Sequence, residues 1–553
     1  MTRTTWILTA AVVAVCFVPS CKKRTERAEK VVDIIELREG GVLTRFEVAP
    51  TEDAMLWLDK GHTTGIVWDA TLRAEVSVEV PAGRAQPASA PTGDPVAPPV
   101  VRTVLDWRWD GPVLRVNGAV AGARLPAAST DDVATARVLY HEAGCPSEAS
   151  LASVVDGVRF PGKVLVVDDC AWTRQLFQQV APRFRGLVLR GGAFPADAFE
   201  GLNHARWTPS LLYIEGIRLE ARMLPDLAPF SGGLVSVSLR DTAIPFEEGS
   251  IDVLTALFDL RFLDLSGTGI RDEDLSRLVA HGPALDELRL SQTWLSAARL
   301  DKVSRMWSLR ALDLSNTRAD AGTLGRFGDL KRLRRLDLRA TAVEDPGIAE
   351  LTGLTGLMEL DAPFWLTDAS APDLAKLTGL RVLRARAVRF RDQGLKHLGA
   401  LEALLFLELS HVNVTDAGVA GLLPAPSLEV LEVEHCPLGD PGMEVLTRMP
   451  RLRKIEIEET NVTDAGFATL ARAPALEVLK AQELPGITDA GMEFVPAFPK
   501  LIALVLDEAE LTDAAVPHLA KATGLRLLSL ETTGISTAGR ERLWEALPAA
   551  IFR

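Results

Sequence analysis

The chain has 553 residues, of which 47% are hydrophobic, and it carries a net charge of −14. This length exceeds that of one ordinary compact domain, and the hydrophobic content is sufficient for a large core. Positive and negative side chains alternate along the sequence without a basic stripe, which argues against nucleic acid as the main partner.

The N-terminus has the pattern of an export signal. Trp6 to Val18 is an uncharged apolar run, too short to span a membrane, so residues 1–20 are predicted to be a signal peptide. The run ends in Val-Pro-Ser-Cys21, which resembles the lipobox of bacterial lipoproteins. This resemblance implies lipidation of Cys21, a polar tether over 21–30 and a membrane anchor. Because Lys22 follows the cysteine, an outer-membrane lipoprotein is expected; the alternative is a periplasmic or secreted protein.

Cysteine usage agrees with export. Cys145 and Cys170 could form a disulfide in an oxidising compartment, whereas Cys436 lies at a repeat position that is expected to be buried. No Cys/His spacing typical of zinc occurs. We therefore expect neither a metal nor a cofactor.

The region before the repeats is predicted to be rich in β-structure. Residues 31–125 contain alternating stretches typical of strands, interrupted by a Pro/Ala-rich loop at 83–99 that should hold no regular structure. Asp131 to Ala143 has a helical pattern. We assign 131–210 to an N-terminal cap that contains degenerate repeats.

Part of this cap resembles another fold. The stretch from Lys163 to Leu176, with Asp168 and Asp169, is similar to the opening of a response-regulator receiver domain, where paired acids bind magnesium. A receiver also needs a phosphoacceptor aspartate after a later strand, and 187–213 supplies none. The stretch is therefore interpreted as a strand of the cap.

From about residue 211 a repeat of 23 to 25 residues dominates. Its core is L-x-x-L-x-L, as in Leu260–Leu265, Leu309–Leu314 and Leu333–Leu338. The units, many of which contain T-x-V-T-D-A-G or a close variant, resemble the repeats of bacterial leucine-rich-repeat proteins. The resemblance implies an α/β solenoid over 211–553, with parallel strands on a concave face and short helices outside.

Two further positions of the repeat have a physical interpretation. A threonine at the ninth position, such as Thr341, should bond the backbone of the neighbouring coil. An Asp-x-Gly motif, such as Asp464-Ala-Gly466, places an aspartate to cap the helix of its repeat. The stretch from Arg540 to Leu547 should form a helix that covers the last repeat.

Strand alternation predicts which side chains a partner would meet. The leucines at positions four and six point inward, so positions three, five and seven should face solvent on the concave sheet. A basic patch, an exposed Phe406 between two valines, and an acidic stripe follow one another there. The candidate binding residues are Val382, Arg384, Arg386, Phe406, Glu408, Val430, Glu432, Glu434, Glu456 and Glu458. A charged, solvated sheet is the alternative interpretation.

His411 and His435 share the eighth position in adjacent repeats and could form a metal site with Glu434, but two exposed histidines are the simpler interpretation. No phosphate loop or nucleophilic triad is recognisable. We therefore expect a non-enzymatic scaffold at the bacterial cell envelope that recognises a protein or peptide on its concave face. The alternatives are a structural or adhesive envelope protein, and an enzyme activity within residues 31–210.

Overall fold

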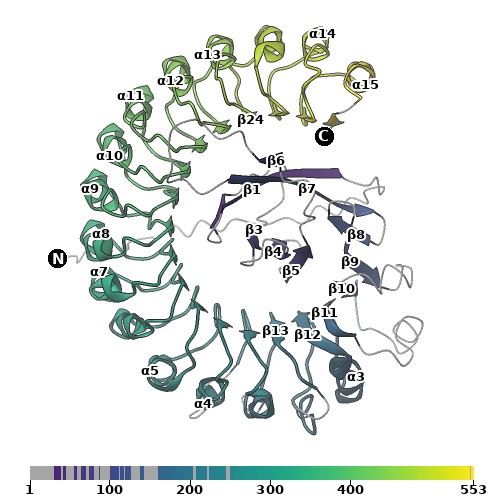
Figure 1. Ribbon diagram of the computed structural model, residues 1–553, viewed down its shortest axis with the longest axis vertical. Coiled ribbons are helices and arrows are strands. Elements are labelled where there is room, and N and C mark those ends of the chain that lie inside the picture. The colour runs from purple at the N-terminus through teal and green to yellow at the C-terminus, as the bar shows by residue number, and fades with distance from the viewer. Residues whose placement is uncertain are drawn as a thin grey trace, which may run out of the picture.

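The computed structural model describes residues 160–548, apart from 203–206, 221–222 and 245–249, together with residues 550–552 and separate strands between 30 and 141. Figure 1 shows a horseshoe with the strands on its inner face and the helices outside. Within the described residues one sheet contains 24 strands. The solenoid predicted from the repeat is confirmed.

The inner face is formed by parallel strands that pair in chain order. They are β10 (Val138–His141), β11 (Phe160–Asp168), β12 (Phe184–Arg190), β13 (Leu211–Glu215), β14 (Ser236–Ser238), β15 (Phe262–Asp264), β16 (Glu287–Arg289), β17 (Ala311–Asp313), β18 (Arg335–Asp337), β19 (Glu359–Asp361), β20 (Val382–Arg384), β21 (Phe406–Glu408), β22 (Val430–Glu434), β23 (Lys454–Glu458), β24 (Val478–Gln482), β25 (Ala503–Val505), β26 (Leu527–Ser529) and β27 (Ile551–Phe552).

Short helices close the repeats on the outer face. The α-helices are α3 (Arg174–Val180), α4 (Ser250–Thr255), α5 (Asp272–His281), α6 (Ala297–Leu300), α7 (Ala321–Leu324), α8 (Asp345–Glu350), α9 (Ala371–Leu374), α10 (Asp392–Leu398), α11 (Asp416–Ala420), α12 (Asp440–Leu446), α13 (Asp464–Leu470), α14 (Val516–Leu519) and α15 (Thr537–Ala546). The 3-10 helices are η1 (Ala181–Arg183), η3 (Pro225–Phe230), η4 (Asp301–Arg305), η5 (Phe327–Asp329), η6 (Leu351–Gly353), η7 (Asp368–Ser370) and η8 (Gly491–Ala497). Helix α15 confirms the predicted C-terminal helix, and none of the described helices is long and apolar enough to cross a membrane.

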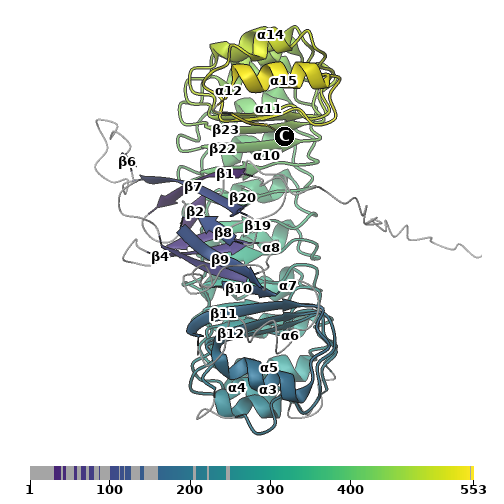
Figure 2. The ribbon, with the colours of Figure 1, turned by 90° about the vertical axis from the view of Figure 1, so that its right-hand side faces the viewer.

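The N-terminal strands lie on the concave side of the horseshoe (Figures 1 and 2). They are β1 (Lys30–Arg38), β2 (Val42–Thr44), β3 (Met55–Leu58), β4 (Thr64–Asp69), β5 (Ala74–Glu79), β6 (Gln86–Pro87), β7 (Val100–Asp110), β8 (Val113–Val116) and β9 (Ala119–Leu125). Strands β7, β8 and β9 are antiparallel, and β9 then pairs with β10 in parallel. The antiparallel sheet is thus continuous with that of the solenoid.

Two local predictions for this region are wrong. The short strand β6 lies inside the loop predicted at 83–99, because Gln86 and Pro87 pair with β7. Strand β10 replaces the C-terminal part of the helix predicted at 131–143. It pairs on both sides with β9 and β11, and Leu139 is fully buried. Sheet pairing here overrides the local helical pattern.

One continuous apolar core runs along the solenoid between the sheet and the helices. The register aligns the inward leucines of successive repeats, as in Leu383, Leu407 and Leu431, and all three are fully buried. Cys436 is also buried, as expected, and burial raises the pKa of its thiol to about 11. The ninth-position threonines behave differently from expectation: the Thr341 hydroxyl donates to the carbonyl of Leu338 in its own repeat, not to the next coil.

Most of the Asp-x-Gly aspartates do not cap their own helices, which corrects the prediction; Asp320, which accepts from the Thr323 N–H, is an exception. Asp464 is the first residue of α13, and Thr463 is the residue whose side chain caps it. The Asp464 carboxylate instead accepts hydrogen bonds from the backbone N–H (2.8 Å) and the hydroxyl (2.7 Å) of Thr488 in the next repeat. A Cβ on Gly491 would collide with the same carboxylate, so the glycine leaves room for it.

This staple recurs along the solenoid, with the aspartate of one repeat bonded to a serine or threonine that precedes the outer-face helix of the next. The pairs include Asp272 with Ser296, Asp345 with Thr367, Asp392 with Thr415, Asp440 with Thr463, Asp489 with Thr512 and Asp513 with Ser536. Each staple joins two neighbouring repeats, so it stabilises the stacking of the coils as well as the individual helix.

Candidate functional site

The concave sheet is hollowed to form a groove of about 560 Å³ that runs across many repeats. Its lining includes Arg384, Arg386, Phe406, Glu408, Glu432, Glu434 and Glu456 from the predicted set. Register explains why they meet: Phe406 pairs with Val382 and Val430 on its two sides, and Glu408 pairs with Arg384 and Glu432. Adjacent strands thus form continuous rows of side chains about 4.8 Å apart.

The apolar residues of this face are not exposed, which corrects the prediction for Phe406. Val382, Phe406 and Val430 form one apolar cluster in which the ring of Phe406 is only 4% exposed. The guanidinium of Arg384 lies 5.3 Å from the centroid of that ring. The aromatic side chain therefore contributes to packing on the concave face and is not an open anchor for a partner.

The predicted acidic stripe is largely neutralised by lysines. The Lys454 ammonium lies 2.6 Å from a Glu432 carboxylate oxygen and 3.1 Å from one of Glu456, and Lys480 approaches Glu456 at 3.1 Å. The side chain of Lys454 is only 3% exposed. Burial works against the charged form of Glu456, but the two lysines lower its pKa to about 2. Sequence reasoning missed Lys454, although it stands at the third repeat position and could have been read there.

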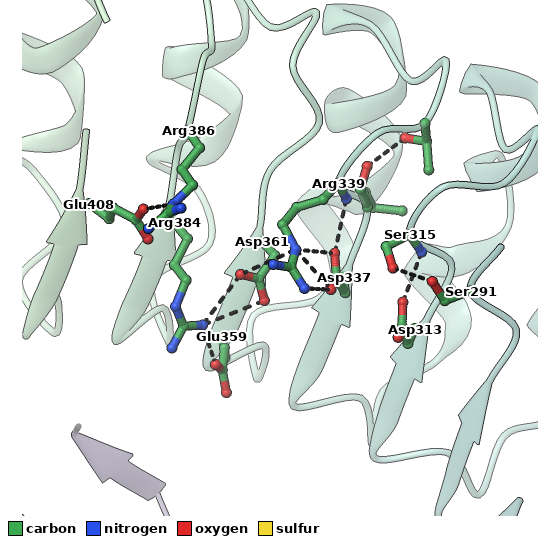
Figure 3. Close-up of polar contacts among 12 residues, drawn as sticks. Ser291, Asp313, Ser315, Asp337, Arg339, Glu359, Asp361, Arg384, Arg386 and Glu408 are labelled. Atoms are coloured by element: carbon green, nitrogen blue, oxygen red, sulfur yellow. Dashed lines mark hydrogen bonds and ion pairs between the residues drawn. The ribbon is translucent and has the colours of Figure 1, made fainter. Parts of the chain in front are cut away.

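The basic patch is paired in the same way, as Figure 3 shows. Arg386 forms an ion pair with the buried Glu408, and Arg384 contacts Glu359 and Asp361. Burial and the charge of Glu432 raise the pKa of Glu408, against the opposing effect of Arg386. The two arginines are thus bound to carboxylates within the sheet.

A second charged cluster lies further toward the N-terminal repeats. Glu287 contacts Arg289 at 2.6 Å and Arg335 at 3.0 Å. Arg339 contacts Asp337 at 2.6 Å, and its side chain remains 48% exposed. Sequence reasoning missed Glu287. That residue occupies the third repeat position, so the repeat register alone could have identified it.

The seventh-position glutamates carry the charge that remains least compensated. Single carboxylate oxygens of Glu434, Glu456 and Glu458 lie within 4.8 Å of one another. Burial, followed by the charges of Glu434 and Glu483, raises the pKa of Glu458 to about 7. This crowding favours a partner with positive charge at this end of the groove.

The predicted histidine pair is close in space. The rings of His411 and His435 lie 4.0 Å apart, and Nε2 of His435 is 3.1 Å from a carboxylate oxygen of Glu459. Both residues adopt a positive φ, at +57° and +53° respectively, because they occupy the left-handed turn that follows each strand. The geometry is set by the repeat, and it is consistent with surface residues at equivalent positions.

The predicted covalent sites are described only in part. Cys170 is disulfide-bonded, and its expected partner Cys145 lies outside the described residues. Cys21 also lies outside them. In the cap, Asp168 is paired with Arg190 at 2.7 Å on adjacent strands, in agreement with a structural role for this stretch.

Comparison with models of known protein families agrees with this architecture. The Leucine Rich repeat family model matches residues 257–279 and 425–446. Among solved structures, an internalin (inlF) from Listeria monocytogenes is 17% identical with a TM-score of 0.40, over 69% of this chain and 88% of that one. A TLR13–ssRNA13 complex is 18% identical with a TM-score of 0.48, over 78% of this chain and 64% of that one.

No curated protein sequence matches the chain. The family match falls on repeats whose strands, helices and inward leucines follow the pattern described above. The protein is an α/β solenoid built from leucine-rich repeats.

Proposed function

We propose that this protein is a non-enzymatic scaffold of the bacterial cell envelope that binds a protein or peptide in its concave groove. Leucine-rich-repeat solenoids generally serve as protein-binding scaffolds, because stacked repeats present an extended concave surface. The observation that carries the proposal is the groove itself, a rigid hollow lined by charged side chains from successive parallel strands. A pre-ordered surface of this kind loses little conformational entropy on binding.

The charge pattern of the groove supports recognition of an extended partner. Toward the middle of the solenoid Arg339 and Arg386 keep about half of their side-chain surface exposed. Toward the C-terminal repeats the groove carries the crowded glutamates around Glu458. A partner with an acidic end and a basic end would be oriented by this polarity, an effect that acts mainly on the association rate and on specificity.

The cellular location is proposed from the N-terminal sequence and from one structural feature. The segment before Cys21 has the pattern of an export signal with a lipobox. A disulfide at Cys170 is favoured by an oxidising compartment such as the periplasm or the cell surface. Mass spectrometry of the membrane fraction tests the anchor, since an acylated mature N-terminus at Cys21 is expected and an unmodified protein that starts elsewhere would contradict it.

The groove is tested by affinity capture from envelope extracts, followed by titration of the captured partner. Arg339→Glu combined with Arg386→Glu should slow association strongly at low salt, because both side chains reach solvent. Arg542→Glu, which reverses a charge on the outer helix α15, is the matched control and should leave affinity unchanged. Equal affinity of all three proteins would exclude the groove as the binding site.

A further inference from the structure

The edge of the sheet at the C-terminal ends of its strands, here called the C-terminal rim, carries two exposed tryptophans. Trp294 follows β16 and is 78% exposed, and Trp365 follows β19 and is 46% exposed. Each lies beside an arginine of the next repeat: the Arg318 guanidinium is 5.2 Å from the Trp294 ring centroid, and that of Arg389 is 4.8 Å from the ring of Trp365.

The repeat itself does not require tryptophan at this position. The equivalent residue in other repeats is Gly269, Ala342, Asn413 or Asn461. The flanking side chains Thr293 and Leu295 are buried, so the position between them points outward. Large apolar surface exposed to water is unfavourable, and a cation–π contact at an exposed site is weak compensation. The two rings are therefore not explained by stability of the solenoid.

The arrangement is a row of isolated ring faces and cations. One equivalent position in five successive repeats is occupied by Trp294, Arg318, Ala342, Trp365 and Arg389. The two tryptophans are three strand spacings apart, about 14 Å at ~4.8 Å per strand. Within the described part of the chain neither arginine of this row forms an ion pair, so both guanidiniums are available to an anion.

This geometry discriminates among classes of ligand. The centre of a protein interface is a contiguous, fully desolvated apolar patch, whereas these rings are separated by small and charged side chains. A chain of sugar rings offers flat C–H faces at intervals, and each face can stack on an isolated tryptophan. Single-stranded nucleic acid can also stack on aromatic side chains, but proteins that bind it provide a positively charged groove along its backbone, whereas this row contains two arginines.

We propose that the C-terminal rim between Trp294 and Arg389 binds an acidic polysaccharide. Sugar rings stack on Trp294 and Trp365, and carboxylates on the same chain pair with Arg318 and Arg389. The rim lies outside the candidate protein-binding residues of the concave groove, so this site is independent of the proposed function.

Titration of the purified full-length protein with three probes tests the proposal. The probes are oligogalacturonate, which carries a carboxylate on every ring, neutral dextran, and poly(U) RNA. Tryptophan fluorescence and affinity electrophoresis report binding. Oligogalacturonate should bind and change the fluorescence, and dextran should bind more weakly.

Substitutions in the row and on the opposite edge of the sheet provide the controls. Trp294→Asn and Trp365→Asn should each weaken oligogalacturonate binding about tenfold, in the range of aromatic stacking. The double variant Arg318→Gln/Arg389→Gln should bind oligogalacturonate no more tightly than dextran. Trp307 is 65% exposed beside Arg332 on the opposite edge of the sheet, and Trp307→Thr, as at Thr355, should leave binding unchanged.

Each variant should keep the thermal unfolding midpoint of the parent protein, since asparagine and threonine already occur at the equivalent positions and Arg318 and Arg389 are exposed. The proposal is overturned if the parent protein binds none of the sugars, or if it binds poly(U) in preference to oligogalacturonate. It is also overturned if the Trp294 and Trp365 variants bind as well as the parent, or if Trp307→Thr is equally impaired. These outcomes are independent of the test of the proposed function, in which the affinity of the groove variants for a captured protein partner is measured.

Discussion

The staple between repeats at Asp464 allows a quantitative test of what holds the solenoid together. Its carboxylate accepts two hydrogen bonds from Thr488, one from the backbone N–H at 2.8 Å and one from the hydroxyl at 2.7 Å. Hydrogen bonds to a charged group contribute about 1.5–3 kcal/mol each. Both residues are half-buried, so solvent weakens the pair, and we expect Asp464→Ala to reduce the free energy of unfolding by about 2–3 kcal/mol.

Graded variants separate the hydrogen bonds from other effects of the substitution. Asp464→Asn keeps an oxygen that can accept from the Thr488 N–H, so it should lose about half as much stability as Asp464→Ala. Glu402→Ala removes an exposed carboxylate in another repeat and should cost less than about 0.5 kcal/mol. Urea unfolding followed by circular dichroism measures all three.

A double-mutant cycle with Gly491 tests the geometry directly. A Cβ at Gly491 would collide with the Asp464 carboxylate and with no other residue, so Gly491→Ala should destabilise the parent protein. In the Asp464→Ala background that collision is absent, and the second substitution should cost much less. Additive effects, or an Asp464→Ala variant as stable as Glu402→Ala, would refute the assignment of this staple.

Three further substitutions follow from burial, charge and backbone geometry. Phe406→Ala should reduce the free energy of unfolding by about 2–4 kcal/mol because the ring is packed against its neighbours; an unchanged urea midpoint would show that the ring is exposed after all. The pKa of Glu458 is raised to about 7 in the folded state, above its unfolded value, so its charged form destabilises the fold and stability is lost as pH rises from about 4.5 to 7. Glu458→Gln, which copies Gln482, should therefore raise the urea midpoint at pH 8 and not at pH 4; an equal gain at both values would contradict the shift. Thr532 has a φ of +58°, where Gly267 stands in an equivalent turn, and Thr532→Gly should stabilise the protein by about 1 kcal/mol in the same assay; a lower midpoint would mean that the turn depends on the threonine side chain.

The amino-acid sequence by itself determines the solenoid. The spacing of the leucines sets both the repeat length and which side chains point inward, because strand alternation is a local property of the backbone. Leu383, Leu407 and Leu431 are fully buried, as the pattern predicts. The same register identifies the rows of the concave face, and there it could also have revealed Glu287 and Lys454.

Only the tertiary structure determines which side chains of the concave face are buried and with which residues they interact. Phe406 follows the pattern of a solvent-facing position, yet neighbouring strands bring Val382, Val430 and Arg384 close enough to bury it. Strand β10 forms where the local sequence favours a helix, because two parallel partners are available to Leu139 and its neighbours.

In the Asp-x-Gly motif, too, one feature follows from the sequence and another depends on the tertiary structure. The sequence correctly places the aspartate at the start of a helix, but its hydrogen bonds go to the next coil, where Thr488 meets Asp464. The partner of the aspartate in these hydrogen bonds depends on how adjacent coils stack. In most copies of the motif, as at Gly491, the glycine also makes space for the carboxylate of the repeat before it. A contact between residues 24 positions apart is fixed by the stacking of repeats, and local propensity carries no information about it.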